Sequence, residues 1–318
     1  MGADRELLRL QHAVHRRVQR DRHQPDVGHR LPRIPAHRTG SRLPSRPGHQ
    51  GDPRLIETWA IVVLAVVGLV AGIAGGMLGI GGSVVIIPAL AVVFRGKAWD
   101  DIHLFQAAAM VVNIAVAIPG AYRHWKARAI PWDFVRIFGP AALLSIGLGV
   151  WLSNQFENEP LRLIFASFLV WVVAHTLWKL SRKESDFAPE HARVTVPRAG
   201  AVGVVTGAAA GLLGIGGGIV SVPLAHVACR LPLKRCIAAS AVVMVVTSCV
   251  GATIKLATLA PHGQRWGDAL LMALVLAPTA MVGAYFGAGL THRSSLRTLR
   301  LVFCALLIVM AGRMAGLY

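Results

Sequence analysis

Two uncharged stretches of this chain are too long for a single straight membrane crossing, and each holds a glycine cluster near its middle. Residues 58–94 and 199–229 contain no Asp, Glu, Lys or Arg. A straight helix over these stretches would measure roughly 55 and 46 Å, whereas the hydrocarbon core of a bilayer is about 30 Å thick. Because glycine lets a helix unwind at low steric cost, we expect each stretch to break at its cluster.

The two clusters are copies of one motif. Gly79-Ile-Gly-Gly-Ser-Val-Val-Ile-Ile-Pro88 returns 135 residues later as Gly214-Ile-Gly-Gly-Gly-Ile-Val-Ser-Val-Pro223. We therefore predict two related transmembrane repeats, residues 55–190 and 191–318. Repeats that face a shared site near mid-bilayer are typical of secondary transporters.

Composition supports a multi-pass membrane protein. Hydrophobic residues make up 54% of the chain and charged residues 15%, and the mean hydropathy is +0.56. Eight uncharged stretches follow residue 55, and breaking the two long ones gives ten segments, five per half. An odd number per half inverts the second half, so the predicted fold is all-α with two inverted five-segment repeats. The short segments 83–94 and 218–229 either cross fully or form half-helices.

The distribution of Lys and Arg predicts the orientation. If all ten segments cross, the loops at 123–136, 179–198, 230–235 and 293–300 share one side and carry most of these residues. The positive-inside rule then makes that side cytoplasmic.

Residues 1–54 differ from the rest of the chain. They contain twelve Arg and no Lys, Phe, Tyr, Trp or Cys, and we predict a basic disordered extension. Five interspersed acidic residues and the absence of aromatic residues argue against a nucleic-acid-binding arm. The segment is either a true tail or the product of an over-extended start.

The glycine clusters predict a binding site for a small anion. A helix that begins at Ser83 or Gly218 presents unpaired N–H groups and a positive dipole end, and open backbone in lipid persists only where a partner or a cavity satisfies it. Polar residues on the third segment of each half would flank this site. The candidate substrate-binding residues are Gly79, Gly81, Gly82, Ser83, Pro88, Asn113, Gly214, Gly216, Gly217, Gly218, Pro223, Ser240, Thr247 and Ser248.

The alternative is that glycines only permit close helix packing. Two other sets of glycines, at spacing i, i+4, are assigned to this role: Gly68, Gly72 and Gly76, and Gly203, Gly207 and Gly211. Gln106 is expected to make an interhelical hydrogen bond. Lys255 is expected either to anchor a helix end or to draw anions to a pore mouth.

Several classes of function lack their residues. No acidic residue lies inside an uncharged stretch, so a carboxylate proton relay is missing, which favours an anionic substrate. The four cysteines have no metal-binding spacing, and neither cluster is followed by the Lys-Ser/Thr of a nucleotide-binding loop. We predict no enzyme activity, metal or cofactor.

The paired Gly-Ile-Gly-Gly clusters, each ending in a proline nine residues after its first glycine, resemble the TauE/SafE sulfite exporter family over about residues 57–318. The resemblance implies a multi-pass protein of the bacterial inner membrane that carries sulfite, an organosulfonate or a related sulfur oxyanion or carboxylate. The alternative function is a non-transporting intramembrane scaffold or assembly factor.

Overall fold

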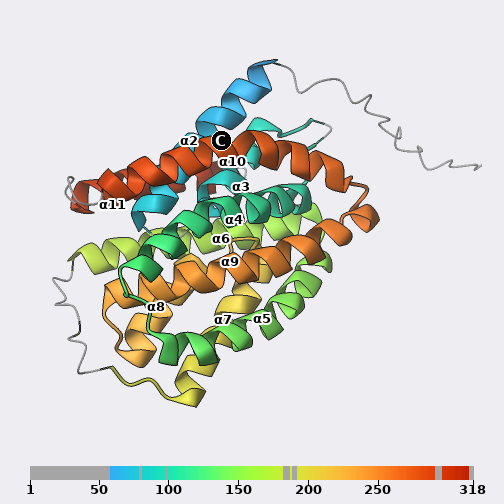
Figure 1. The fold of residues 1–318 in the computed structure, drawn as a ribbon. Helices are drawn as coiled ribbons and strands as arrows, with labels where there is room; N and C mark the ends of the chain where they lie inside the picture. Colours follow the sequence, from blue (N-terminus) through green and yellow to red (C-terminus); the bar gives the residue numbers. More distant parts are fainter. Residues whose placement is uncertain are drawn as a thin grey trace, which may run out of the picture. The chain divides into compact units, whose positions relative to one another are not determined.

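The structure, a computed structural model, describes residues 58–78, 81–97, 99–181, 187, 192–290 and 296–314. The predicted extension at residues 1–54 lies outside them. The described residues form helices and no strand (Figure 1). The elements are α2 (Thr58–Leu78), α3 (Ser83–Val93), α4 (Ile102–Lys126), α5 (Trp132–Asn154), α6 (Asn158–Ser181), α7 (Val196–Leu213), α8 (Gly218–Cys229), α9 (Leu233–Ala257), the 3-10 turn η2 (Ala260–His262), α10 (Trp266–Leu290) and α11 (Leu296–Met314).

Two α-helices, α3 and α8, are much shorter than the others. Six of those in the described part of the chain are long and apolar enough to cross a membrane: α4, α5, α6, α7, α9 and α10. The helices after the glycine motifs, α3 and α8, have 11 and 12 residues. At 1.5 Å per residue they reach roughly 17 Å, about half of the hydrocarbon thickness. The lengths of α3 and α8 favour the half-helix alternative for these two segments.

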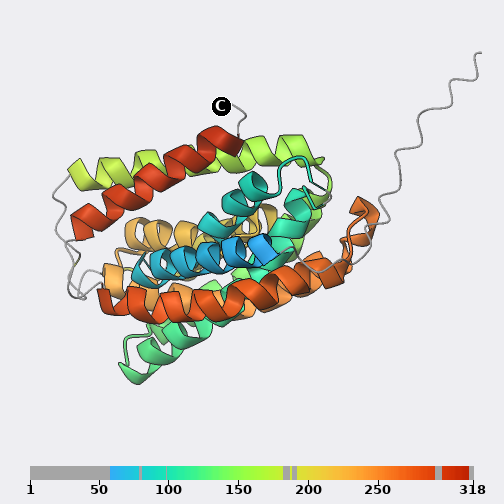
Figure 2. The same cartoon turned by 90° about the horizontal axis from the view of Figure 1, so that it is seen from above.

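Glycines hold α2 directly against α10. Cβ atoms added at Gly68, Gly72 and Gly76 would overlap backbone atoms of Leu276, Ala280 and Ala284, respectively. The two sets of residues meet in the same order, so α2 and α10 run parallel. Figure 2 shows α2 (blue) beside α10 (orange).

The same contact joins α7 to α5. Cβ atoms added at Gly203, Gly207 and Gly211 would overlap the carbonyl groups of Phe138, Ala142 and Ile146, again in the same order. The prediction that both glycine sets serve close packing is confirmed. Close backbone approach matters in lipid, where packing rather than hydrophobic burial drives helix association.

Helices α4 and α9 form the buried centre and run antiparallel. Lys255 near the end of α9 contacts His103 at the start of α4. Gly251, earlier on α9, contacts Met110, which is later on α4. Thirteen residues of α4 and twelve of α9 are buried. The start of α4 and the end of α9 therefore lie at the same end of the helical unit, which we call end A. The opposite end, with the end of α4 and the start of α9, is end B.

Candidate functional site

Both glycine motifs lie between helices. The chain leaves α2 at Leu78 and enters α3 at Ser83, and it leaves α7 at Leu213 and enters α8 at Gly218. Gly79, a predicted site residue, lies outside the described residues. Gly81 has φ +82°, and Gly214, Gly216 and Gly217 have φ +72°, +66° and +91°. This left-handed region favours glycine, since other residues pay a steric cost there.

The two motifs meet at the same two side chains, Asn113 of α4 and Met244 of α9. A Cβ atom at Gly81 would lie 3.0 Å from Met244 Sδ and 3.1 Å from Asn113 Oδ1. A Cβ atom at Gly216 would lie 2.8 Å from Asn113 Nδ2, 2.9 Å from Ser248 Oγ and 3.1 Å from Met244 Cγ. Gly81 and Gly216, 135 residues apart in sequence, are thus separated by little more than one layer of side chains.

The first motif has its helix N-terminus occupied. The N–H groups of Gly82 and Ser83 both donate to Asn113 Oδ1 at 3.2 Å, and Asn113 Nδ2 donates to Ser83 Oγ at 3.0 Å. Asn113 is fully buried. Its amide oxygen accepts from the N–H groups that an anion would otherwise use.

The second motif is different. Among the described residues, no side-chain oxygen accepts from the first N–H groups of α8. Two hydroxyl groups beside the motif also lack a partner there, those of Ser248 and Thr206, which are 0% and 3% exposed. Ser248 Oγ lies next to Gly216, and Thr206 Cγ2 would lie 2.8 Å from a Cβ atom at Gly217. Buried polar groups are almost always hydrogen-bonded, so the unsatisfied Ser248 hydroxyl beside this uncapped helix N-terminus marks a candidate binding position, whereas Thr206 presents its methyl group, Cγ2, to Gly217.

The remaining predicted residues lie around this centre or away from it. Thr247 Oγ1 donates within α9, with Val243 O at 3.0 Å, and also lies 3.3 Å from Gly216 O. Ser240 Oγ accepts a hydrogen bond from Ser221 Oγ at 2.7 Å. Ser240 precedes Ser248 by eight residues on α9, so it lies roughly 12 Å from Ser248 along the helix. Pro88 and Pro223 are interior residues of α3 and α8, apart from the glycines at the helix starts.

Sequence reasoning missed Met244 and Thr206. Met244 carries no polar group, so nothing in the sequence separates it from core residues. Thr206 had a usable signal, since it is a hydroxyl residue beside Gly207 in the packing stripe of α7 and just before the second motif.

A second polar cluster lies at end A, around Lys255. The ammonium contacts His103 Nδ1 at 2.7 Å, Ser153 Oγ at 2.9 Å and Asn154 Oδ1 at 2.9 Å. Lys255 is only 1% exposed, so the expectation that it anchors a helix end at the interface is wrong. The ring of His262, in η2, stacks on the ring of His103 with centroids 3.8 Å apart.

This stack predicts a pH dependence of stability. Burial lowers the pKa of His262 below its ordinary value of 6.5, and the Lys255 charge lowers it further, whereas Asp101 acts in the opposite sense. The folded state then binds the proton less readily than the unfolded state, so stability falls as pH falls through 6.5. We expect the melting temperature to drop between about pH 7.5 and about pH 5.5.

The variant His262→Phe keeps an aromatic ring against His103 and should show a smaller drop over that range. The other ionisable groups that face His262 are Lys255, His103 and Asp101. Burial raises the pKa of Asp101 above 3.8, so its contribution to the pH dependence has the opposite sign. An equal drop in both proteins would assign the pH dependence to another group.

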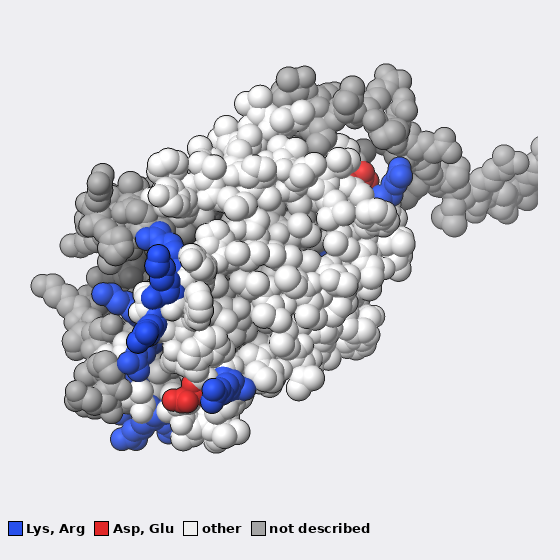
Figure 3. Space-filling view, viewed as in Figure 1, with Lys and Arg blue, Asp and Glu red and all other residues white. Residues whose placement is uncertain are grey.

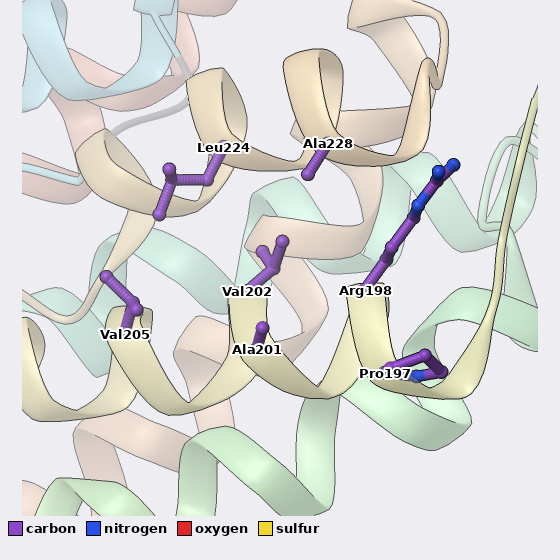
Figure 4. Close-up of a pocket in the computed structure, with 7 residues that line it drawn as sticks. All are labelled: Pro197, Arg198, Ala201, Val202, Val205, Leu224 and Ala228. Atoms are coloured by element: carbon purple, nitrogen blue, oxygen red, sulfur yellow. The ribbon is translucent and has the colours of Figure 1, made fainter.

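The surface has two further features. Figure 3 shows Lys and Arg gathered at end B. The exposed basic residues at the helix termini of this end include Arg123, Lys126, Arg230, Lys234 and Arg235. A groove of about 340 Å³ lies between α7 and α8 and is apolar except for Arg198 (Figure 4). Its lining residues come from the first part of α7 and the second half of α8, and they do not include the glycine motif.

Comparisons with known proteins identify one family and several relatives named as membrane transporters. The family model described as "Sulfite exporter TauE/SafE" matches residues 64–314. The probable membrane transporter protein MamO of Paramagnetospirillum magneticum is 25% identical over 80% of this chain, which spans 44% of MamO. A probable membrane transporter protein of Methanocaldococcus jannaschii is 28% identical over 78% of this chain and 92% of the relative. The protein YunE of Bacillus subtilis, named in the same way, is 24% identical over 79% and 95%. No solved structure gives a significant match.

Proposed function

Because the chain belongs to the sulfite exporter TauE/SafE family of membrane transporters, we propose that it carries a small anion across the bacterial inner membrane by secondary transport. The substrate class is sulfite, an organosulfonate or a related sulfur oxyanion or carboxylate. The observation that carries the proposal is the uncapped N-terminus of α8 beside the unpartnered hydroxyl of Ser248.

The architecture that we propose is a pair of inverted repeats, residues 55–190 and 191–318, each broken at its glycine motif. The exchanged glycine contacts support it, since the first helix of each half packs against the fourth helix of the other half. Helix directions support it as well. The stack of His262 on His103 puts the start of α10 at end A with the start of α4, and α2 runs parallel to α10.

These directions make α2 with α3 a hairpin that enters and leaves at end A. In the second half, α7 is parallel to α5, and α5 ends at Ser153 and Asn154 beside Lys255, at end A. The helix α7 therefore starts at end B, as does α9, and α8 returns the chain to that end. Two hairpins that enter from opposite sides and meet in the protein interior match the broken-helix sites of secondary transporters.

The anion seat is the N-terminus of α8. A helix N-terminus attracts negative charge through its free N–H groups and its dipole. Ser248 adds a hydroxyl donor, and Asn113 Nδ2 lies close to the same point of Gly216. The first motif differs because Asn113 Oδ1 already occupies the equivalent position on α3.

The seat is closed in this conformation. Asn113, Met244 and Ser248 leave no room for a single methyl group on Gly216. Transport by alternating access then requires the α7–α8 hairpin to move relative to α4 and α9, which would open the seat to one end at a time. The basic end B is the cytoplasmic end by the positive-inside rule.

Anion-dependent thermal stabilisation of the purified protein tests the seat. A ligand that binds only the folded state raises the melting temperature, so sulfite, thiosulfate, methanesulfonate and acetate should be compared. We expect at least one of them to stabilise the protein. The variant Ser248→Ala should weaken its apparent affinity roughly tenfold, as expected for one hydrogen bond to a charged group.

The matched control is Thr253→Ala, which removes an exposed hydroxyl from the same helix. Its affinity should equal that of the unchanged protein. If no anion of the panel stabilises the protein and none is exchanged by counterflow in proteoliposomes, the scaffold alternative gains the support and the carrier proposal is abandoned.

A further inference from the structure

Lys255 is a buried cation inside a membrane-spanning helix. Its three donors are satisfied by His103 Nδ1, Ser153 Oγ and Asn154 Oδ1. Because His103 accepts at Nδ1, its proton is on Nε2, which lies 3.2 Å from Phe156 O. All three partners of the ammonium are therefore neutral acceptors. They replace water around the cation without cancelling its charge.

No carboxylate of the described residues lies within ion-pair distance of this ammonium. The ion pairs among the described residues join Arg162 to Asp100 and to Glu159. Asp101 is close enough for its charge to act, but its Oδ1 accepts from the N–H groups of His103 and Leu104 at the start of α4. A buried cation without a counter-ion is expensive, and such residues in membrane proteins mark pathways for ions or substrates.

A hydrogen-bond chain connects this charge to the end of α7, which leads into the second glycine motif. Ser153 Oγ donates to Gln106 Oε1 at 3.0 Å, and Gln106 Nε2 donates to Leu212 O, near the end of α7, at 3.0 Å. A Cβ atom at Gly214 would lie 2.7 Å from Gln106 Cβ. Lys255 itself is seven residues beyond Ser248 on α9, roughly 10 Å towards end A.

The cluster also has a partly exposed side. His103, Ser153 and Lys255 are buried, whereas Asn154 and His262 are partly exposed. An anion that approaches from end A therefore meets Asn154 and His262 before it reaches the ammonium.

We propose that Lys255 is a second anion-binding residue, which receives the anion at end A on its way to or from the seat at the N-terminus of α8. The anion takes the place of Asn154 Oδ1 on the ammonium and supplies the missing negative charge. The cluster selects for negative charge, and the proposal rests on the transport function proposed above.

The test uses Lys255→Met, which keeps the length of the side chain and removes the charge. Sulfite binding is measured by thermal shift, and sulfite exchange by counterflow. We expect the apparent dissociation constant to rise roughly ten- to a hundredfold. The melting temperature without ligand should fall, because the buried acceptors His103 Nδ1 and Ser153 Oγ lose their donor, so the ligand-induced shift is measured relative to each variant's own baseline.

Two comparisons complete the design. Lys234→Met removes an exposed lysine at the other end of α9 and should leave sulfite affinity unchanged. Asn154→Asp should also weaken sulfite binding roughly tenfold, because the new carboxylate pairs with Lys255 and competes with the anion. This second variant decides the matter if Lys255→Met does not fold.

The outcomes separate the two proposals. If the unchanged protein binds sulfite and both Lys255→Met and Asn154→Asp bind it equally well, Lys255 has only a structural role and this inference is overturned. If the unchanged protein binds no anion of the panel, the proposed transport function fails before Lys255 is tested.

Discussion

The variant Gly207→Ala is expected to be strongly destabilised. A Cβ atom at this position would overlap both Ala142 O and Ser145 Oγ, and the carbonyl belongs to the backbone of α5, which cannot rotate away. Overpacking of this kind costs about 3 kcal/mol at the upper end of its range, which corresponds to roughly 10 °C in melting temperature. The loss of stability is measured as the melting temperature in detergent and as the monodisperse fraction on size-exclusion chromatography.

The control for this prediction is Gly200→Ala in the same helix. A Cβ atom there meets nothing within 4 Å. Alanine is the better helix former by up to about 1 kcal/mol, so this variant should be as stable as the unchanged protein or slightly more stable. The two substitutions are chemically identical, and equal melting temperatures would show that α5 and α7 do not approach as closely as described.

Much of the fold follows from the sequence. Absence of charge over long stretches predicts helices in a membrane, and i, i+4 glycine spacing predicts close packing, since both depend on local pattern alone. The partner of each glycine stripe could not be predicted. Gly72 meets Ala280 and Gly207 meets Ala142, and this exchange between halves is a property of tertiary arrangement.

The difference between the two half-sites could be predicted only in part. Asn113 and Ser248 are 135 residues apart, the same separation as the two motifs, so the sequence pairs them. The asparagine side chain is long enough to reach the N–H groups of α3, whereas the serine hydroxyl remains without a partner. Which helix N-terminus stays open depends on this difference in reach.

The burial of Lys255 could not be predicted from the sequence. A single cation near the end of an apolar stretch fits an interfacial anchor as well as an interior charge. The residues that enclose it come from the start of α4, 152 positions away in the chain, and from the end of α5, 101 and 102 positions away. None of them forms a recognisable motif with it.

The variant Gly216→Ala is expected to abolish anion binding and transport in a protein that still folds. Its Cβ atom would enter the space between Asn113 Nδ2 and Ser248 Oγ, at 2.8 and 2.9 Å, where the anion is proposed to bind. The left-handed backbone at φ +66° adds a strain of about 1–2 kcal/mol. We expect affinity for the stabilising anion to fall at least about a hundredfold, or roughly 2.7 kcal/mol.

Gly263→Ala separates strain from blockage. Gly263 has φ +73°, close to that of Gly216, but a Cβ atom there meets nothing within 4 Å. Both variants therefore carry the same backbone strain, and only Gly216→Ala fills the seat. Gly81→Ala should reduce binding less than Gly216→Ala, because Asn113 already occupies the N-terminus of α3. If Gly81→Ala abolished binding while Gly216→Ala retained it, the anion would have to be reassigned to the first motif.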